Sequence, residues 1–450
     1  MATTTAPSPI APTSTRKERW AWYLYDFGNS AYAAVVLLAV YSAYFQGTIV
    51  GGPAGSRLWG WAVGIAMLVV AITSPILGAI ADYSAWKKHF LLFYTVLSVA
   101  FTALLFFATP GAVAIGMGFF IVAEIGYRSA QVFYNRLLPE IASPAEIGRV
   151  SGNGWAIGTA GGILCLLLVL PLIVLQQQGI IPLSGDLIVR LTLVITAVFF
   201  ALSAIPIFLW LPERAQKQPL PPGENYLTVA FKQLRRTFRT AGHFKEFVKY
   251  MVAFLIYNDG IIMALDFAAI IGAVLFGMNQ QDLIIFVIVV QITNVIGAYA
   301  FGLWVDKLGG KRSLSLSILM MIAVVGAMYF AQTTTQFFII GAAAGFAMAG
   351  TQSVSRTLVG MFSPRGQSAE FYGFFAMTGR TSSFIGPAVY GAIAFRAALY
   401  FQEQGQAAVL AEQNGQRLAI LSIAAFLFIG LVLLAFVDEN KARHAASSHQ

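Results

Sequence analysis

The 450-residue chain has little charge, few histidines and almost no cysteine. Only 10% of its residues are charged and 58% are hydrophobic, whereas about a quarter of an ordinary soluble domain is charged. A single cysteine, Cys165, excludes an intrachain disulfide or a cluster of thiolate metal ligands. The histidines all fall in polar loops or the tail, which argues against haem ligation and buried histidine catalysis. We therefore expect no enzyme, no cofactor and no metal site.

Apolar runs of about 20 residues, long enough to cross the ~30 Å hydrocarbon layer, recur along the whole chain. We expect an all-α membrane protein with twelve transmembrane helices in two pseudo-symmetric six-helix bundles, working as a monomer. Residues 1–19 are predicted to be a disordered arm without a cleavable signal, 20–211 and 246–437 the bundles, 212–245 a linker, and 438–450 a tail. The spans are predicted near residues 22–47, 59–81, 90–109, 111–136, 151–175, 188–211, 246–274, 282–304, 313–331, 335–361, 371–396 and 417–437.

Lysine and arginine concentrate in the arm, the linker, the tail and every second loop, which lie on one side of this topology. The loops of the other side hold only Arg57, Arg190, Arg396 and Arg417. By the positive-inside rule both termini are expected in the cytoplasm. This arrangement suits a bacterial inner membrane, although an organelle stays open. The net charge of +9 is thus a topology signal, and we expect no nucleic-acid partner.

The linker is predicted to contain an amphipathic helix that lies on the membrane surface. Its apolar and basic residues fall on opposite faces at helical spacing, a pattern that is drawn to anionic lipid. An orienting linker is favoured over a regulatory site. The apolar face comprises Leu227, Phe231, Leu234 and Phe238, and the basic face comprises Lys232, Arg235, Arg236 and Arg239.

The two halves of the chain echo each other. Gly78-Ala-Ile-Ala-Asp82 matches Gly302-Leu-Trp-Val-Asp306 at an offset of 224 residues (302 − 78), each where an even-numbered span ends. Gln131 and Gln352 form a second pair at an offset of 221 residues. Equal spacing in equivalent spans indicates two parallel repeats.

The loop after the second span of each half resembles the signature of the major facilitator superfamily, Gly-x-x-x-Asp-basic-x-Gly-x-basic. The first copy keeps Gly78 and Asp82 but departs from the pattern at Tyr83, Ala85 and Trp86. The resemblance implies that Asp82, Asp306, Lys307 and Arg312 are gate residues rather than substrate ligands. The second copy fits through Gly302, Asp306, Lys307, Gly309, Lys311 and Arg312.

Within that superfamily, several stretches resemble the autophagy-related vacuole effluxer family and its bacterial relatives. The resemblance implies a twelve-helix transporter that works by alternating access and, more specifically, amino-acid export. The stretches are residues 22–32 (WYLYDFGNSAY), 133–140 (FYNRLLPE), 257–260 (YNDG), 352–356 (QSVSR), 370–373 (EFYG) and 386–387 (GP).

Seven charged residues lie inside the predicted spans, where a charge costs about 2.5–3.5 kcal/mol unless it finds a partner or water. A lipid-facing anchor has no use for so many, so we expect carriage of a small polar solute. A lipid or drug exporter and a non-transporting receptor or scaffold remain as alternatives. The seven are Asp26, Glu124, Arg128, Asp259, Asp266, Arg356 and Arg380.

In the fourth span, Glu124, Arg128, Gln131 and Asn135 share one helical face. Glu124 lies about 12 residues, or roughly 18 Å, from the outer end, which is near the midplane. One interpretation makes Glu124 a proton or substrate-amine site and Arg128 a clamp for a substrate carboxylate. The other is an i, i+4 pair that merely neutralises two charges. Both interpretations stay open.

In the seventh span, Asp259 is our first candidate for a proton carrier. It is predicted near mid-depth beside Tyr257, Asn258 and Gly260, with no basic residue on the interior of its own span. Loss of water favours the neutral form of an unpaired carboxyl, a property that proton coupling needs. An ion pair with Arg356 or Arg380 is the structural alternative.

Other polar residues fit a gate or the edge of a cavity. We expect Asp26 to form a gate ion pair with Arg128 or Arg136 rather than to contact substrate directly, and Asn29 beside it in the first span is a candidate for the substrate or proton site. Arg380 and Gln352 are candidates for substrate contact, because a guanidinium is a ready carboxylate clamp. Arg356, near the membrane edge, is expected to act as a gate.

Overall fold

In the computed structural model almost all of the described chain is helical. We describe residues 14–142, 146–214, 217, 223, 225–226, 228–229, 231–232, 235, 239, 242, 244–364, 371–372, 374–375, 378–379 and 383–448, without the side chains of residues 82, 147 and 148.

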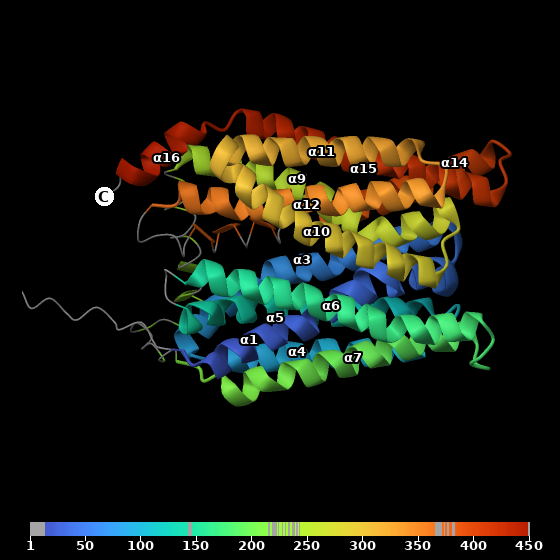
Figure 1. Cartoon of the computed structure of the whole chain (residues 1–450), viewed down its shortest axis with the longest axis horizontal. Helices are drawn as coiled ribbons and strands as arrows, with labels where there is room; N and C mark the ends of the chain where they lie inside the picture. The colour runs from blue at the N-terminus through green and yellow to red at the C-terminus, as the bar shows by residue number, and fades with distance from the viewer. Residues whose placement is uncertain are drawn as a thin grey trace, which may run out of the picture.

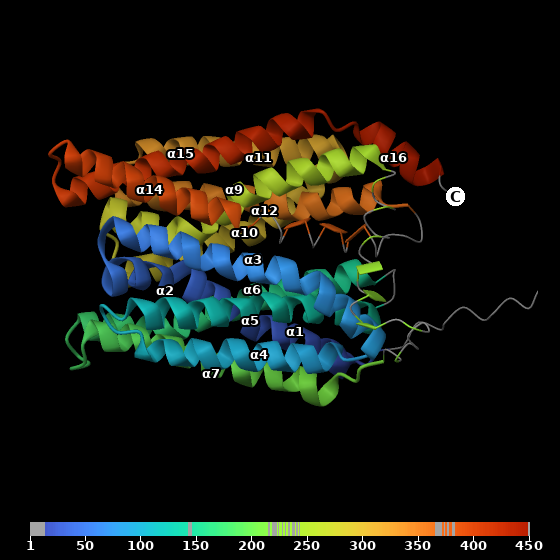
Figure 2. The same cartoon turned by 180° about the vertical axis from the view of Figure 1, so that it is seen from behind.

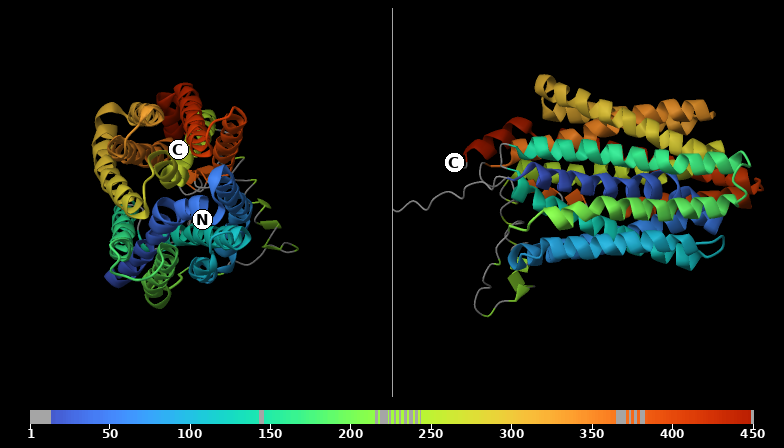
Figure 3. Two further views of the ribbon diagram at one scale, coloured as in Figure 1. Left: turned by 90° about the vertical axis from the view of Figure 1, so that its right-hand side faces the viewer. Right: turned by 60° about the horizontal axis from the view of Figure 1, so that its bottom comes forward.

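The helices form two groups that lie one above the other in Figure 1 and in the left view of Figure 3, which looks along the helix axes. The first group comprises α1 (Arg16–Tyr32), η1 (Ala33–Ala39), α2 (Tyr41–Tyr44), η2 (Phe45–Val50), α3 (Gly52–Ser84), α4 (Lys87–Leu104), η3 (Leu105–Phe107), α5 (Val113–Ile141), α6 (Ile147–Gln177) and α7 (Gly185–Trp210). The second comprises α9 (Lys245–Phe276), α10 (Gln280–Leu308), α11 (Gly310–Phe330), α12 (Thr334–Phe362), α14 (Ile385–Glu403), α15 (Ala408–Ala435) and α16 (Glu439–Ser448). We call them the first and the second bundle.

The beginning of α1 and the helix α16 lie at the same end of the molecule (Figure 1). We call this the terminal end and the other the distal end. Among the described residues, 11 helices are long and apolar enough to cross a membrane. The twelfth predicted span, near 371–396, coincides with α14 and with the described helical residues that precede it.

The second half of the first span is not a regular α-helix. After Tyr32 the chain continues as the π-helix η1, the four-residue helix α2 and a second π-helix, η2. This irregular stretch packs against α6, α9 and α10, so it lies where the two bundles meet. Helical backbone of this kind is frequent at functional sites. The sequence of residues 33–50 contains no proline that would have predicted the change.

The two halves repeat a contact at the terminal end that supports the internal duplication. The carboxylate of Glu213, just after α7, accepts hydrogen bonds from the backbone N–H groups of Lys87 and Lys88 at the start of α4 (2.6 and 3.1 Å). The carboxylate of Glu439, just after α15, accepts from Gly310 and Lys311 at the start of α11 (3.3 and 3.0 Å). Each carboxylate satisfies donors that the helix itself leaves unpaired and lies at the positive end of the helix dipole.

We expect Glu439→Gln to lower the free energy of unfolding by about 1 kcal/mol, because a neutral amide is a weaker acceptor at a helix start. Thermal unfolding in detergent measures the change. Lys441→Gln is the matched control, because the Lys441 side chain is mostly exposed and should change stability by less than about 0.5 kcal/mol. Equal stability of the wild type and Glu439→Gln would contradict a stabilising role for the contact.

Most of the predicted linker helix lies outside the described residues. Of its apolar face only Phe231 is described, and its side chain is exposed. The prediction that this segment rests on the membrane surface therefore stays a prediction.

Candidate functional site

A buried ion pair lies on α5 near the middle of the membrane-spanning region. Arg128 Nε donates to Glu124 Oε1 at 2.7 Å, with the Glu124 side chain fully buried and that of Arg128 18% exposed. The other carboxylate oxygen of Glu124 has no hydrogen-bond partner in the described part of the chain. An ionised carboxylate can accept at both oxygens, so this buried oxygen lacks a hydrogen bond that it could accept.

The same face of α5 becomes more exposed toward the terminal end. Glu124 is buried, Arg128 and Gln131 are partly buried, and Asn135 is exposed. These residues follow each other at helical spacing, and Arg128 among them interacts electrostatically with Asp266 of the second bundle. The exposure of this face thus rises toward the terminal end.

Two tyrosines flank the pair. The ring of Tyr127 stacks on that of Tyr32 with centroids 4.5 Å apart, and the Arg128 guanidinium lies 5.2 Å from the centroid of Tyr127. Gln131 Nε2 donates to the Tyr127 hydroxyl at 3.1 Å. Tyr32 is the last residue of α1 before the backbone becomes irregular, so η1 begins beside the pair.

Asp266 of α9 brings the second bundle to this pair. It is only 2% exposed and interacts electrostatically with Arg128 and Glu124 across the boundary between the bundles. Its carboxylate oxygen Oδ2 has no hydrogen-bond partner among the described residues. One guanidinium is thus ion-paired with Glu124 and interacts electrostatically with Asp266. From the sequence, Asp266 was predicted to lie in a span but was not among the candidate site residues.

Asp259 lies seven residues before Asp266 on the same face of α9, and its carboxylate binds the start of α14. Its Oδ2 accepts from the Gly386 backbone N–H at 3.0 Å, and the residue is 1% exposed. A side chain at position 386 would collide, because a Cβ there would lie 2.7 Å from Asp259 Oδ1. The described contact of Asp259 is therefore a helix start, and not the ion pair with Arg356 that the sequence allowed; Arg380 lies outside the described residues.

Asp26 faces the second bundle nearer the terminal end. It interacts electrostatically with Arg356 of α12, with Asn29 beside it on α1. The predicted partners were Arg128 and Arg136, but Arg128 pairs with Glu124, and Arg136 Nη1 donates to the Gly78 carbonyl at 3.0 Å. The Arg356 side chain is exposed, whereas Asp26 is partly buried.

Arg136 also explains the glycine of the first loop motif. A Cβ at Gly78 would lie 2.2 Å from Arg136 Nη2, so a side chain there would displace the guanidinium from this position. The side chain of Asp82 lies outside the described residues. Asp306, Lys307 and Arg312 are exposed at the terminal end, where a gate would be. Their role stays a prediction.

The remaining candidates, Tyr257, Asn258 and Gln352, lie within the second bundle. The Tyr257 hydroxyl hydrogen-bonds Ser355 Oγ at 2.7 Å inside the second bundle, so Tyr257 joins α9 to α12. Asn258 Nδ2 donates to the Gly379 carbonyl at 3.3 Å, and Gln352 is partly buried.

Hydrogen bonds close the two bundles together at the distal end. Gln46 Nε2 donates to Glu412 Oε1 at 2.7 Å, and Gln416 Nε2 donates to Ser56 Oγ at 2.6 Å. Closer to the centre, Trp59 Nε1 donates to the Asp266 carbonyl at 2.8 Å. None of these residues was a sequence candidate.

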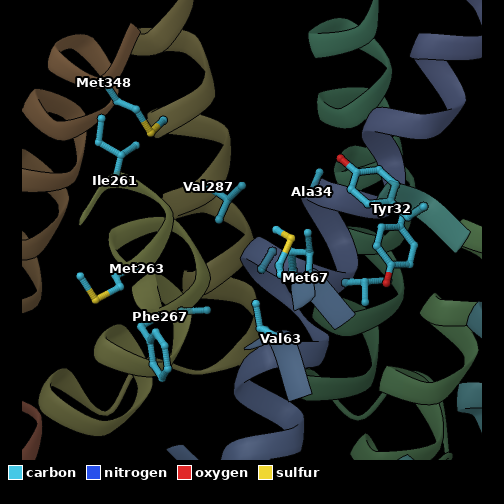
Figure 4. Packing of buried hydrophobic residues seen from close by; sticks show 14 of the residues in the cluster. Tyr32, Ala34, Val63, Met67, Ile261, Met263, Phe267, Val287 and Met348 are labelled. Atoms are coloured by element: carbon cyan, nitrogen blue, oxygen red, sulfur yellow. The ribbon is translucent and has the colours of Figure 1, made fainter. Parts of the chain in front are cut away.

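Backbone contact between α3 and α14 completes this distal closure; Figure 2 shows the two helices side by side. A Cβ at Gly60 would lie 2.1 Å from the Pro387 carbonyl oxygen, and one at Gly391 would lie 2.6 Å from that of Ser56. Apolar residues from both bundles also approach each other here, with Val63 and Met67 of α3 near Phe267 of α9 in Figure 4. These contacts close the two bundles against each other at the distal end.

Comparison with known proteins adds the family. The model of the family described as "Vacuole effluxer Atg22 like" matches residues 60–447. The chain belongs to this family. It is 28% identical over 431 residues to "Uncharacterized MFS-type transporter YxiO" of Bacillus subtilis, covering 94% of this chain and 95% of that protein. It is 22% identical over 425 residues to "Autophagy-related protein 22" of Yarrowia lipolytica, covering 75% and 70% of the two chains.

Solved structures agree on the fold. A bacterial homologue of the human lysosomal transporter Spinster, in an inward-facing and unoccupied conformation, superposes with a TM-score of 0.70 at 14% identity, covering 96% of this chain and 98% of that one. A D-xylose–proton symporter gives a TM-score of 0.66 at 13% identity, with coverage of 95% and 98%. The predicted major facilitator fold and the predicted family are therefore confirmed, and this Atg22-family protein is a secondary transporter of the major facilitator type.

Proposed function

We propose that this transporter carries zwitterionic amino acids in exchange for, or together with, protons. The observation that supports this most is the buried Glu124–Arg128 pair facing Asp266 of the other bundle. Ionisable groups from both bundles thus meet at one place, which is where a carrier that closes alternately at its two ends holds its solute.

The cluster offers a matched group for each end of an amino acid. The Arg128 guanidinium can bind the α-carboxylate through two parallel hydrogen bonds. Glu124 and Asp266 each have an oxygen without a partner among the described residues, and these can accept from the ammonium group. With all three groups ionised, the cluster carries one excess negative charge in a region of low dielectric. One bound ammonium group or one proton would neutralise it.

The protonation state of Asp259 can affect the contact between the bundles at the distal end. The N–H that binds its carboxylate belongs to Gly386, in the first turn of α14, where a negative charge is favoured by the helix dipole. The next residue, Pro387, contacts Gly60 of the first bundle. Protonation of Asp259 would weaken its hold on α14 and, through this turn, the distal contact between the bundles.

For the direction of transport we propose export. With the basic loops in the cytoplasm, the terminal end faces the cytoplasm and the distal end, where the bundles are closed, faces outward. The carrier would load its solute from the cytoplasm and release it outside, as amino-acid export requires.

A substrate screen in reconstituted vesicles tests the proposal. Purified protein should exchange radiolabelled neutral amino acids across the membrane, and an imposed pH gradient should concentrate them. Lysolipids are the comparison ligands, because the same fold could carry amphipathic molecules. Vesicles that move lysolipids, or no solute, while the protein stays folded would contradict the assignment.

Asp259→Asn is expected to abolish concentrative transport on a pH gradient and to spare counterflow, in which labelled and unlabelled amino acid exchange at equal pH. The amide keeps the shape and one acceptor oxygen for the Gly386 N–H but cannot carry a proton. Uptake is measured in vesicles with and without the gradient. If the variant still concentrates substrate, Asp259 is not the proton carrier, whatever the substrate is.

A further inference from the structure

A pocket of about 340 Å³ opens on the outer surface of the first bundle, away from the cluster of Glu124, Arg128 and Asp266. It lies between the first two turns of α1 and the beginning of α6. Both helices are candidate membrane spans that begin at this level, Arg16 in one and Arg149 in the other. The pocket is therefore at the depth of lipid headgroups. Its lining comprises Arg16, Arg19, Trp20, Tyr23, Asn153, Ala156 and Ile157.

Two arginines line the pocket, and one of them, Arg19, is ion-paired with Glu146. Arg19 is committed to Glu146 at 2.9 Å and to Ser14 at 2.8 Å. The side chain of Arg149 also pairs with Glu146, at 2.8 Å. Arg16, in contrast, is exposed and makes no hydrogen bond or ion pair within the part of the chain that the structure describes. An anionic group entering the pocket would meet this guanidinium first.

The floor of the pocket is amphipathic. Trp20 is 42% exposed and packs edge-on against Tyr23 at 5.8 Å, while Ala156 and Ile157 supply an apolar wall from α6. Aromatic residues with one wet and one apolar side are enriched at membrane interfaces. Asn153, which is exposed, adds a neutral donor beside the wall.

Further along α6 toward the distal end, the helix surface turns to large apolar residues. Leu164, Leu167 and Leu168 are all exposed, as expected for side chains that touch acyl chains. A ligand with an anionic head and a long apolar tail would place its head at Arg16 and its tail along this surface. A free anion would bind only at Arg16 and would not contact the apolar surface of α6.

We propose that this pocket binds the headgroup of an anionic phospholipid, with its phosphate at Arg16 and its acyl chain along α6. The proposal does not depend on the transported solute. A phosphate is preferred over other anions because guanidinium groups bind phosphates through two parallel hydrogen bonds. The lipid, rather than soluble phosphate, is the occupant because the pocket lies at the headgroup level and continues into an apolar surface.

Fluorescence quenching by brominated lipids tests the site. The protein is reconstituted in phosphatidylcholine with increasing brominated phosphatidylglycerol, and quenching of Trp20 is obtained as the difference between wild type and Trp20→Phe. We expect phosphatidylglycerol to quench at several-fold lower mole fraction than brominated phosphatidylcholine. Arg16→Gln should reduce this preference by about fivefold, the worth of one arginine near a membrane surface. Lys17→Gln, which removes an equal charge one residue away beside Trp210, should keep the preference.

Two results would overturn the proposal. An unchanged preference in Arg16→Gln, with helicity and unfolding temperature equal to wild type, would show that the quenching lipid is not held at this pocket. Stabilisation of detergent-purified wild type by inorganic phosphate, equal to that by phosphatidylglycerol and lost in Arg16→Gln, would show a site for free phosphate instead.

Discussion

Replacement of Arg128 by glutamine should reduce transport at least 100-fold and destabilise the protein. The change removes the ion-pair partner of Glu124, which is fully buried, and the cation that interacts electrostatically with Asp266, which is 2% exposed. Removing one partner of a buried ion pair costs about 3–5 kcal/mol, because the remaining charge is left without compensation. Uptake in vesicles measures the first effect, and thermal unfolding in detergent measures the second.

A charge swap separates the roles of this pair in folding and in binding. The double variant Glu124→Arg, Arg128→Glu keeps an i, i+4 pair on the same helix face. We expect it to fold with a stability much closer to wild type than Arg128→Gln and to lose substrate binding, because the two ligand groups have exchanged places. Binding at the wild-type level in a folded swap would mean that the pair only neutralises two buried charges.

Replacement of Gly60 by alanine should prevent distal closure and hold the transporter open at that end. The added Cβ would lie 2.1 Å from the Pro387 carbonyl oxygen, a distance that backbone atoms cannot accommodate without moving α3 away from α14. Spin labels on the distal ends of α3 and α14 should show a longer separation, and net transport should fall to background.

Gly326→Ala is the matched control for Gly60→Ala. A Cβ at Gly326 has no atom within 4 Å, so the change adds the same methyl group to a transmembrane helix without a collision. It should leave both the label separation and transport unchanged. A Gly60→Ala variant with the wild-type separation and rate would show that the close contact between α3 and α14 is not needed for the transport cycle.

The topology could be predicted from the sequence because each of its signals is local. Apolar runs gave the spans, and the echo of Gly78–Asp82 in Gly302–Asp306 gave the internal repeat. A second sign of the repeat was not predicted: Glu213 binds the start of α4, and Glu439 binds the start of α11. A comparison of residues just after the sixth and twelfth spans would have found it, because the two glutamates are 226 residues apart (439 − 213).

The partners of the buried charges could be predicted only where both lie on one helix. Glu124 and Arg128 were paired correctly by their spacing. Asp26 was predicted to pair with Arg128 or Arg136, whereas it interacts electrostatically with Arg356 of the other bundle, because sequence spacing carries no information on how two bundles face each other. The bond from the Gly386 backbone N–H to Asp259 could not be predicted either, because a backbone donor has no side-chain signature.

The distal closure was also outside the reach of sequence reasoning. Gln46, Ser56 and Gln416 are neutral and lie near the ends of their spans, where polar residues are ordinary. Their function depends on meeting each other across a boundary between segments about 360 residues apart, as Ser56 and Gln416 do. Only the folded arrangement brings them together.

The central claim is that polar residues of α5 line a path that water enters from the terminal end while the distal end is closed. Cysteine labelling tests it directly, since the one native cysteine, Cys165, is buried and can be replaced by serine. In oriented vesicles, a membrane-impermeant thiol reagent on the terminal side should label Asn135→Cys and Gln131→Cys, and substrate should slow the labelling of the deeper Gln131→Cys. Labelling from the distal side alone, or from neither side, would contradict the account.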